Sequence, residues 1–122
     1  MKIEVIDTQR NGIHLVRVEG RLDAYFSSQL EDEIDTLLEQ KTKSIILDFS
    51  EVTYLSSSGL RVLLSIHKET EKDGGLVLIN LRDIVKKVIE VAELDDYMKQ
   101  AETVEEAMAI LEGKMEKTVA SS

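Results

Sequence analysis

Two short segments that are apolar at almost every position constrain the fold more than any other feature of the chain. They are "SIILDF", residues 44–49, and "LVLINL", residues 76–81. A half-buried strand alternates apolar and polar residues, whereas a strand that is apolar throughout is typical of a parallel sheet with helices on both faces. Between the two segments, "SGLRVLLSIHKETEKDGG" repeats apolar residues at helical spacing and ends in a glycine pair. Together they predict a strand–helix–strand unit at the centre of an α/β sheet. Leu60, Leu63, Leu64 and His67 share one predicted face of this helix, and Val62 and Ile66 lie beside it.

The N-terminal segment predicts a β-hairpin. "KIEVIDTQ" and "IHLVRVEG" flank Asn11-Gly12, a pair that is typical of two-residue turns. The alternation of the second strand slips by one position at Val16, which predicts either a bulge or a strand covered on both faces. Gly20 is expected to close this strand.

Three further helices and one short element complete the predicted order. Residues 23–40 carry an apolar stripe at helical spacing, and "DIVKKVIEVAEL" predicts a helix with Asp83 as its N-cap. "DDYMKQA" is compatible with a short edge strand or a turn. Thr103 and Glu106 have capping-box spacing at the start of a last helix. Its predicted inner face includes Met108 and Met115. The predicted fold is a single α/β domain with a mixed, mostly parallel sheet of four to five strands, an antiparallel edge hairpin and about four helices.

Charge and composition exclude several classes of function. The 122 residues include 24 acidic and 15 basic side chains, and the net charge of −9 argues against binding to nucleic acid or to an anionic membrane. The chain has no cysteine, so disulfides and thiolate nucleophiles are excluded. His14 and His67 alone do not make a zinc site, and we expect no metal and no cofactor. Because the chain has no apolar signal core and no segment near ~18 apolar residues, we expect a cytoplasmic protein.

The most informative stretch is "YLSSSGLRVLL", in which Ser56, Ser57 and Ser58 precede Gly59 where a predicted strand and loop lead into a helix. One serine is expected to cap the helix. A hydrolase is disfavoured because the nucleophile elbow G-x-S-x-G lacks its first glycine. His67 also lies about 13 Å along the helix from Ser58. A third hypothesis is a phosphate acceptor, because free amides and the helix dipole favour negative charge at the first turn.

The segment "LDFSEVTYLSSSGLRVLL" resembles the signature of the STAS domain, and more narrowly that of bacterial anti-sigma factor antagonists. "VEGRLDAYFSSQLEDEI" and "GGLVLINLRDIVKKVIEVAELDDYM" resemble two further blocks of that family, so the resemblance covers nearly the whole chain. It implies a binding module, not an enzyme. Its implied partner is an anti-sigma factor that is also a serine kinase of the histidine-kinase-like ATPase fold. Phosphorylation by that kinase would end binding, and a metal-dependent serine phosphatase would restore it.

The resemblance also implies roles for individual residues. The phosphorylated serine of the family directly precedes the glycine, which is Ser58 here, while Ser56 stands where the family usually has aspartate. The implied partner-binding residues are Asp23, Ser56, Ser57, Ser58, Gly59 and Arg61. For Asp23 the alternative is an N-cap of the first helix. Arg61 is expected one turn into the serine helix, where it could reach a phosphate or an acidic partner, and its alternative is a solvated side chain. Asp48 is expected to end the central strand and anchor a loop.

We expect the STAS domain to occupy residues 1–117 and residues 118–122 to form a frayed tail. A second functional hypothesis keeps the same fold and makes the chain a stand-alone STAS subunit of another assembly, such as a partner of a transport ATPase or a stress-signalling complex.

Overall fold

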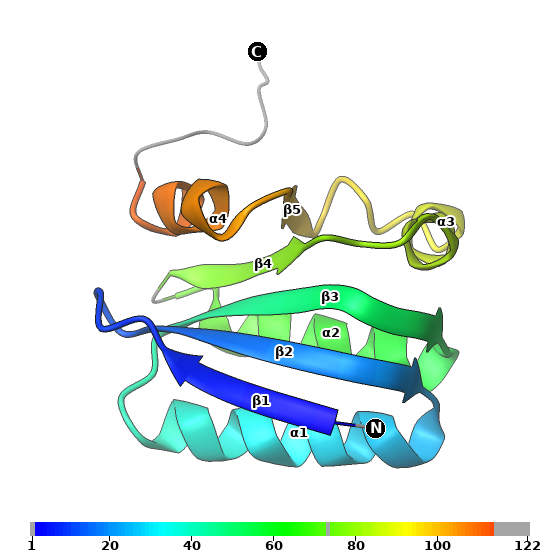
Figure 1. The fold of residues 1–122 in the computed structure, drawn as a ribbon, viewed down its shortest axis with the longest axis horizontal. Coiled ribbons are helices and arrows are strands. Elements are labelled where there is room, and N and C mark those ends of the chain that lie inside the picture. The colour runs from blue at the N-terminus through cyan, green and yellow to red at the C-terminus, as the bar shows by residue number, and fades with distance from the viewer. Residues whose placement is uncertain (1, 73, 114–122) are drawn as a thin grey trace.

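A computed structural model describes residues 2–72 and 74–113 as one five-stranded sheet flanked by four helices (Figure 1). The strands lie in the order β1-β2-β3-β4-β5, with β1 antiparallel to β2 and all other neighbours parallel. The predicted α/β class, the antiparallel edge hairpin and the helix number are therefore confirmed. The strands are β1 (Lys2–Asp7), β2 (Ile13–Leu22), β3 (Ser44–Leu55), β4 (Gly75–Ile79) and β5 (Lys99–Ala101). The helices are α1 (Ala24–Glu39), α2 (Ser57–Thr70), α3 (Asp83–Val91) and α4 (Val104–Leu111).

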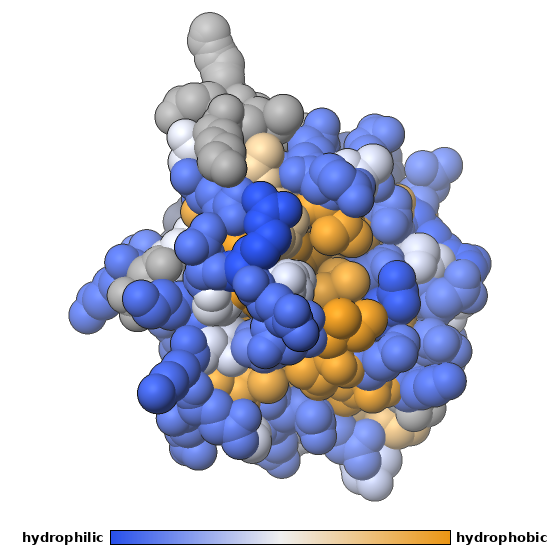
Figure 2. Space-filling view, turned by 60° about the vertical axis from the view of Figure 1, so that its left-hand side comes forward, coloured by the Kyte–Doolittle hydropathy of each residue, from blue (hydrophilic) through white to orange (hydrophobic). Residues whose placement is uncertain are grey.

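The sheet has an apolar core on each face, as the two continuous apolar segments predict. Ile45, Leu47 and Phe49 of β3 point to the larger core, which α1, α2 and α3 cover. Ile46 points to the smaller core under α4. Figure 2 shows that apolar side chains reach the surface between polar ones on the side of the molecule that it presents.

The second strand is covered on both faces, so the bulge that the slip at Val16 also allowed is not needed there. Ile13 and Leu15 lie in the core under α4, whereas Val16 and Val18 lie in the larger core. The register with β3 shifts only further on, between Arg17 and Glu19 and again after Gly20. The prediction that Gly20 closes the strand is wrong, because β2 continues to Leu22 beside the last residues of β3.

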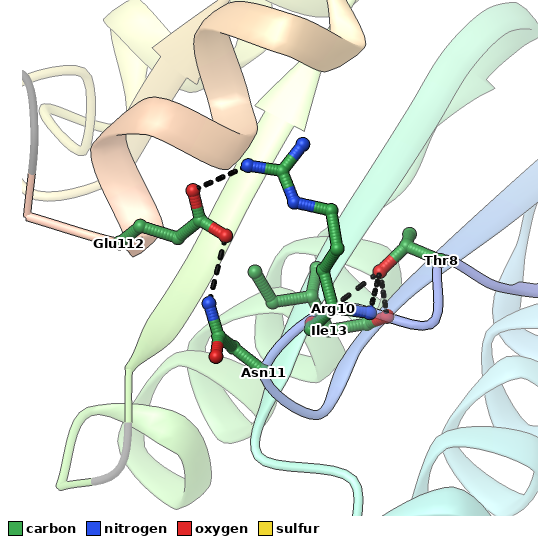
Figure 3. Close-up of polar contacts among 5 residues, drawn as sticks. All are labelled: Thr8, Arg10, Asn11, Ile13 and Glu112. Carbon is green, nitrogen blue, oxygen red and sulfur yellow. Dashed lines mark hydrogen bonds and ion pairs between the residues drawn. The ribbon is translucent and has the colours of Figure 1, made fainter.

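The connection between β1 and β2 is longer than the predicted two-residue turn. It spans residues 8–12, and Asn11 and Gly12 both have the positive φ that the Asn-Gly pair predicts. The Thr8 hydroxyl donates a hydrogen bond of 2.6 Å to the Ile13 carbonyl. Arg10 and Asn11 reach Glu112, just after α4, at 2.7 and 2.8 Å (Figure 3). These bonds hold the longer loop against the C-terminal end of α4.

Two other local predictions need correction. The N-cap of α3 is Arg82 and not Asp83, which is the first helical residue. The inward face of α2 is centred nearer to Val62 and Ile66 than expected: Leu60 and Leu64 pack against the core but are only partly buried, as is His67. The fully buried residues of α2 are Gly59, Val62, Leu63, Ile66 and Thr70.

The C-terminal part agrees with the prediction as far as the structure describes it. The ambiguous segment before the last helix contains the short strand β5, and Thr103 caps α4 by accepting from the Glu106 amide at 3.0 Å. The Glu106 carboxylate bonds the amide of Glu102 at 3.0 Å. Met108 is buried. Met115, the predicted domain end at residue 117 and the predicted tail lie outside the described residues.

Candidate functional site

The candidate site lies where the carboxyl ends of β2 and β3 lead into α1 and α2, at the right-hand end of Figure 1. Leu22 and Leu55 are neighbours in the register of the two strands, and each is the last residue of its strand. Asp23 then caps α1, and Ser56 caps α2. Parallel strands thus bring two helix N-termini to the same edge of the sheet, where ligands of α/β proteins commonly bind.

The strand before the serines is longer than predicted. β3 continues through residues 50–55, with Val52 and Leu55 buried, and the expected loop is reduced to Ser56 alone. Asp48 therefore lies within the strand and does not end it. The serines follow a long, paired strand directly, so their positions are set by the sheet.

Ser56 is fixed by three hydrogen bonds. Its hydroxyl accepts from the Gly59 amide at 3.1 Å and donates to the Leu22 carbonyl at 2.7 Å. Its own amide donates to the same carbonyl at 3.0 Å. Ser56 is thus the expected capping serine, and in place of the usual aspartate of the family it ties the start of α2 to the end of β2.

Ser56→Ala is expected to destabilise the fold by about 1–2 kcal/mol, because it removes a helix cap and a bond to the neighbouring strand. Chemical denaturation of the purified protein measures this free energy of unfolding. Ser57→Ala is the matched control: its hydroxyl is exposed, so we expect a change within about 0.5 kcal/mol. Equal unfolding free energies for Ser56→Ala and Ser57→Ala would contradict the assignment of the cap.

Gly59 lets α2 approach the ends of both strands closely. It is buried, and a Cβ at this position would lie 2.5 Å from Leu55 Cδ1 and 3.2 Å from the Leu22 carbonyl oxygen. Real Cβ atoms do not approach so closely without a shift of the neighbouring atoms. Gly59 and Ser56 therefore form the framework that places the two serines between them.

Ser57 and Ser58 occupy the first two positions of α2 with their hydroxyls free. Ser57 is exposed and Ser58 is partly buried, and neither hydroxyl bonds another described residue. The first intrahelical bond runs from the Leu60 amide to the Ser56 carbonyl at 3.0 Å. The amides of Ser57 and Ser58 have no protein partner within the described part of the chain. Two free amides at the positive end of a helix favour an anion beside these hydroxyls.

The structure confirms a capping role for Asp23, whose carboxylate accepts from the Phe26 amide at 3.0 Å. Arg61 is exposed one turn into α2. The six predicted partner-binding residues therefore lie together, but in two groups. Ser57, Ser58 and Arg61 present groups to solvent, whereas Ser56, Gly59 and Asp23 hold the backbone through caps and close packing.

Neither histidine is placed to activate a serine of this stretch. His14 Nδ1 bonds the Thr42 hydroxyl at 3.0 Å, at the opposite end of the sheet. The His67 ring contacts the Tyr97 ring with centroids 4.5 Å apart, and its Nδ1 is buried without a hydrogen bond. Among the described residues, no group of three or more His, Asp or Glu side chains is close enough to hold a metal ion. The described residues also include no helix that is both long enough and apolar enough to cross a membrane.

A polar network on β3 was not predicted from the sequence. Asp48 is 6% exposed and accepts from the Ser50 amide at 3.0 Å, from Arg17 Nε at 3.3 Å and from Asn80 Nδ2 at 3.5 Å. Burial alone would raise the pKa of Asp48, but these hydrogen bonds outweigh it and hold the pKa below its ordinary value. Only the register that pairs Arg17 with Asp48 brings the two charges together. The network joins β2 and β3 to the residue that directly follows β4.

Asp48→Asn is expected to destabilise the protein at neutral pH by about 1–3 kcal/mol, because hydrogen bonds to a charged group are lost. A carboxyl with a lowered folded pKa stabilises the fold above its unfolded pKa and loses this contribution as pH falls. The difference between wild type and variant should therefore shrink below about pH 4. Thermal melts from pH 7 to pH 3 measure it, and a difference that stays constant would contradict the role of the charge.

Comparison with known proteins agrees with this geometry. Residues 4–107 match the model of the STAS domain, and the chain belongs to the STAS domain family. The anti-sigma-B factor antagonist of Staphylococcus aureus is 26% identical over 106 residues, which cover 86% of this chain and 98% of that protein. The anti-sigma factor antagonist SpoIIAA in its unphosphorylated form is similar with a TM-score of 0.77 and 27% identity, over 94% of this chain and 100% of that one. The Bacillus cell fate determinant SpoIIAA in its phosphorylated form is similar with a TM-score of 0.67 and 27% identity. The match covers 88% of this chain and 96% of that one. The predicted family resemblance is confirmed.

Proposed function

We propose that this chain is an anti-sigma factor antagonist that is switched by phosphorylation of Ser58. In its unmodified form it binds an anti-sigma factor that is also a serine kinase, and this binding releases a sigma factor. Phosphate on Ser58 ends the binding, and a serine phosphatase restores it. The exchange is proposed to take place in the cytoplasm, and the chain itself carries out no catalysis.

One observation carries the proposal: a serine hydroxyl without a hydrogen bond lies at the start of a helix whose first turn is held against the ends of two strands. The Ser58 hydroxyl has no hydrogen-bond partner among the described residues, while Ser56 and Gly59 hold the same turn against Leu22 and Leu55. A kinase thus meets a hydroxyl that has no internal hydrogen bond, on a turn whose position is set by the two strands. The names of the similar proteins support the same conclusion, since they include anti-sigma factor antagonists and a phosphorylated form.

The local chemistry allows the modified state to remain folded. A phosphate adds a charge of about −1.5 to −2, and the first turn of a helix is where such a charge is stabilised, typically by 0.3–1 kcal/mol for surface groups. The switch therefore requires no rearrangement of the sheet. It acts by changing the charge that a partner meets at the start of α2.

The proposal is tested by incubating the protein with ATP and a purified anti-sigma factor of the histidine-kinase-like ATPase class from the same organism, followed by mass spectrometry of the peptide that contains the three serines. We expect one phosphate, which is lost in Ser58→Ala and retained in Ser57→Ala. A phosphate that survives in Ser58→Ala and disappears in Ser57→Ala would move the acceptor by one residue. An unmodified peptide in the presence of an active kinase would contradict the switch.

A further inference from the structure

Arg61 stands in an unfavourable place for a cation. It is the one basic residue in the first two turns of α2, residues 57–64, and the first turn has no acidic residue to balance it. Positive charge near a helix N-terminus opposes the helix dipole, which favours anions there. Arg61 is exposed, and its side chain forms no ion pair or hydrogen bond with any other residue that the structure describes. In the unmodified protein, the side chain thus has no charged partner that would explain its position.

Helix geometry places Arg61 beside the proposed phosphate acceptor. Ser58 is three residues before Arg61, and Ser57 is four residues before it, within one continuous helix. Side chains at these spacings are neighbours on a helix surface, and an acidic group N-terminal to a basic one is the favourable order. Near this turn, the Asp23 carboxylate is bonded to the Phe26 amide, and the Arg21 guanidinium lies 4.1 Å over the Tyr54 ring. Both of these charged groups are already engaged, whereas Arg61 has none of these contacts.

We propose that Arg61 is the internal counter-ion of phosphorylated Ser58, an inference that rests on the proposed function. The guanidinium pairs with the phosphate oxygens from one turn further along the helix, and the free amides of Ser57 and Ser58 face the same group. A guanidinium suits this task because its donors match two phosphate oxygens at once. The residue is mildly destabilising before modification and stabilising after it, so it raises the stability of the phosphorylated form relative to the unmodified one.

A thermodynamic cycle tests this role without any partner protein. Phosphoserine is installed at position 58 by genetic encoding, in wild type and in Arg61→Gln, and the melting temperature of each protein is measured with and without the phosphate. We expect Arg61→Gln to raise the melting temperature of the unmodified protein by about 1 °C and to lower that of the phosphorylated protein by about 1–2 °C. Lys68→Gln, which removes an exposed cation from the last turn of the same helix, should change both forms equally.

A second readout reports on the phosphate itself. Titration followed by phosphorus NMR should give a lower second pKa for the phosphate in wild type than in Arg61→Gln, because a nearby cation favours the dianion. Arg61→Lys should restore part of the difference. Equal changes of melting temperature in both forms, together with an unchanged phosphate pKa, would overturn the proposal.

The experiment separates this inference from the proposed function. If phosphorylated wild type binds the anti-sigma factor as well as the unmodified protein does, the proposed switch is wrong. The role of Arg61 is still supported if Arg61→Gln changes the melting temperatures of the two forms in opposite directions. Arg61→Gln could instead weaken the binding of the unmodified protein and change the melting temperatures of both forms equally. Arg61 would then be a direct partner contact. That result would overturn its role as a counter-ion and leave the proposed function in place.

Discussion

Ser58→Asp is expected to weaken binding to the anti-sigma factor more than about a hundredfold, whereas Ser58→Ala is expected to bind like wild type. Ser58 is partly buried in the free protein, at the start of α2, and a bound partner would enclose it further. Arg61 can pair with an added charge at position 58 in the free protein, but enclosing a charge that the partner surface does not match still costs several kcal/mol. Because 1.4 kcal/mol corresponds to a factor of ten, even about 3 kcal/mol exceeds a hundredfold. Titration calorimetry of each variant against the purified anti-sigma factor measures the effect.

A charge placed elsewhere on the same fold controls for the general effect of added negative charge. Thr36→Asp introduces the same charge at an exposed position near the opposite end of α1. We expect its affinity for the anti-sigma factor to equal that of wild type, since the protein already carries a net charge of −9. A comparable loss of affinity in Thr36→Asp and Ser58→Asp would show that long-range charge, and not the position of Ser58, controls binding.

Gly59→Val is expected to reduce the free energy of unfolding by about 1–3 kcal/mol and to abolish tight binding together with it. The new Cβ would meet Leu55 Cδ1 and the Leu22 carbonyl, and that carbonyl cannot easily retreat because Ser56 bonds it twice. The start of α2 must then move away from the strands, and the two free serines move with it. Chemical denaturation and calorimetry measure the two effects on the same sample.

Two further variants isolate the cause of the Gly59 effect. Ser65→Val, at a partly buried position later in α2, carries the same β-branched side chain and should cost only a few tenths of a kcal/mol. Gly59→Ala should lie between wild type and Gly59→Val, because the Leu55 side chain can rotate away from one methyl group and alanine favours the helix. A Gly59→Val protein as stable as Ser65→Val would show that the close approach is not needed.

The sequence was sufficient to predict most of the fold, because its strongest patterns are local. Continuous apolar segments identified the doubly covered strands, and apolar spacing identified the helices. The capping serine of α2 and the capping threonine of α4 could be expected from residue type and spacing. The far half of β3 was missed because "SEVTYL" mixes polar and apolar residues without a regular period, unlike the buried half before it.

The parts that escaped prediction depend on partners distant in the chain. Ser56 owes its orientation to a carbonyl 34 residues earlier, and no spacing rule relates these two positions. The carboxylate of Asp48 meets Arg17 and Asn80 only through strand register. The family resemblance supplied the predicted acceptor among the three serines. The structure adds that the Ser56 hydroxyl is hydrogen-bonded to the backbone, whereas those of Ser57 and Ser58 have no partner among the described residues.

One measurement tests the central claim most directly: calorimetric titration of the purified anti-sigma factor, with a non-hydrolysable ATP analogue present, into unmodified and enzymatically phosphorylated wild-type protein. Circular dichroism of both forms confirms that each is folded. We expect tight binding of the unmodified form and an affinity more than about a hundredfold weaker after phosphorylation of Ser58. Equal affinity of the two folded forms would contradict it.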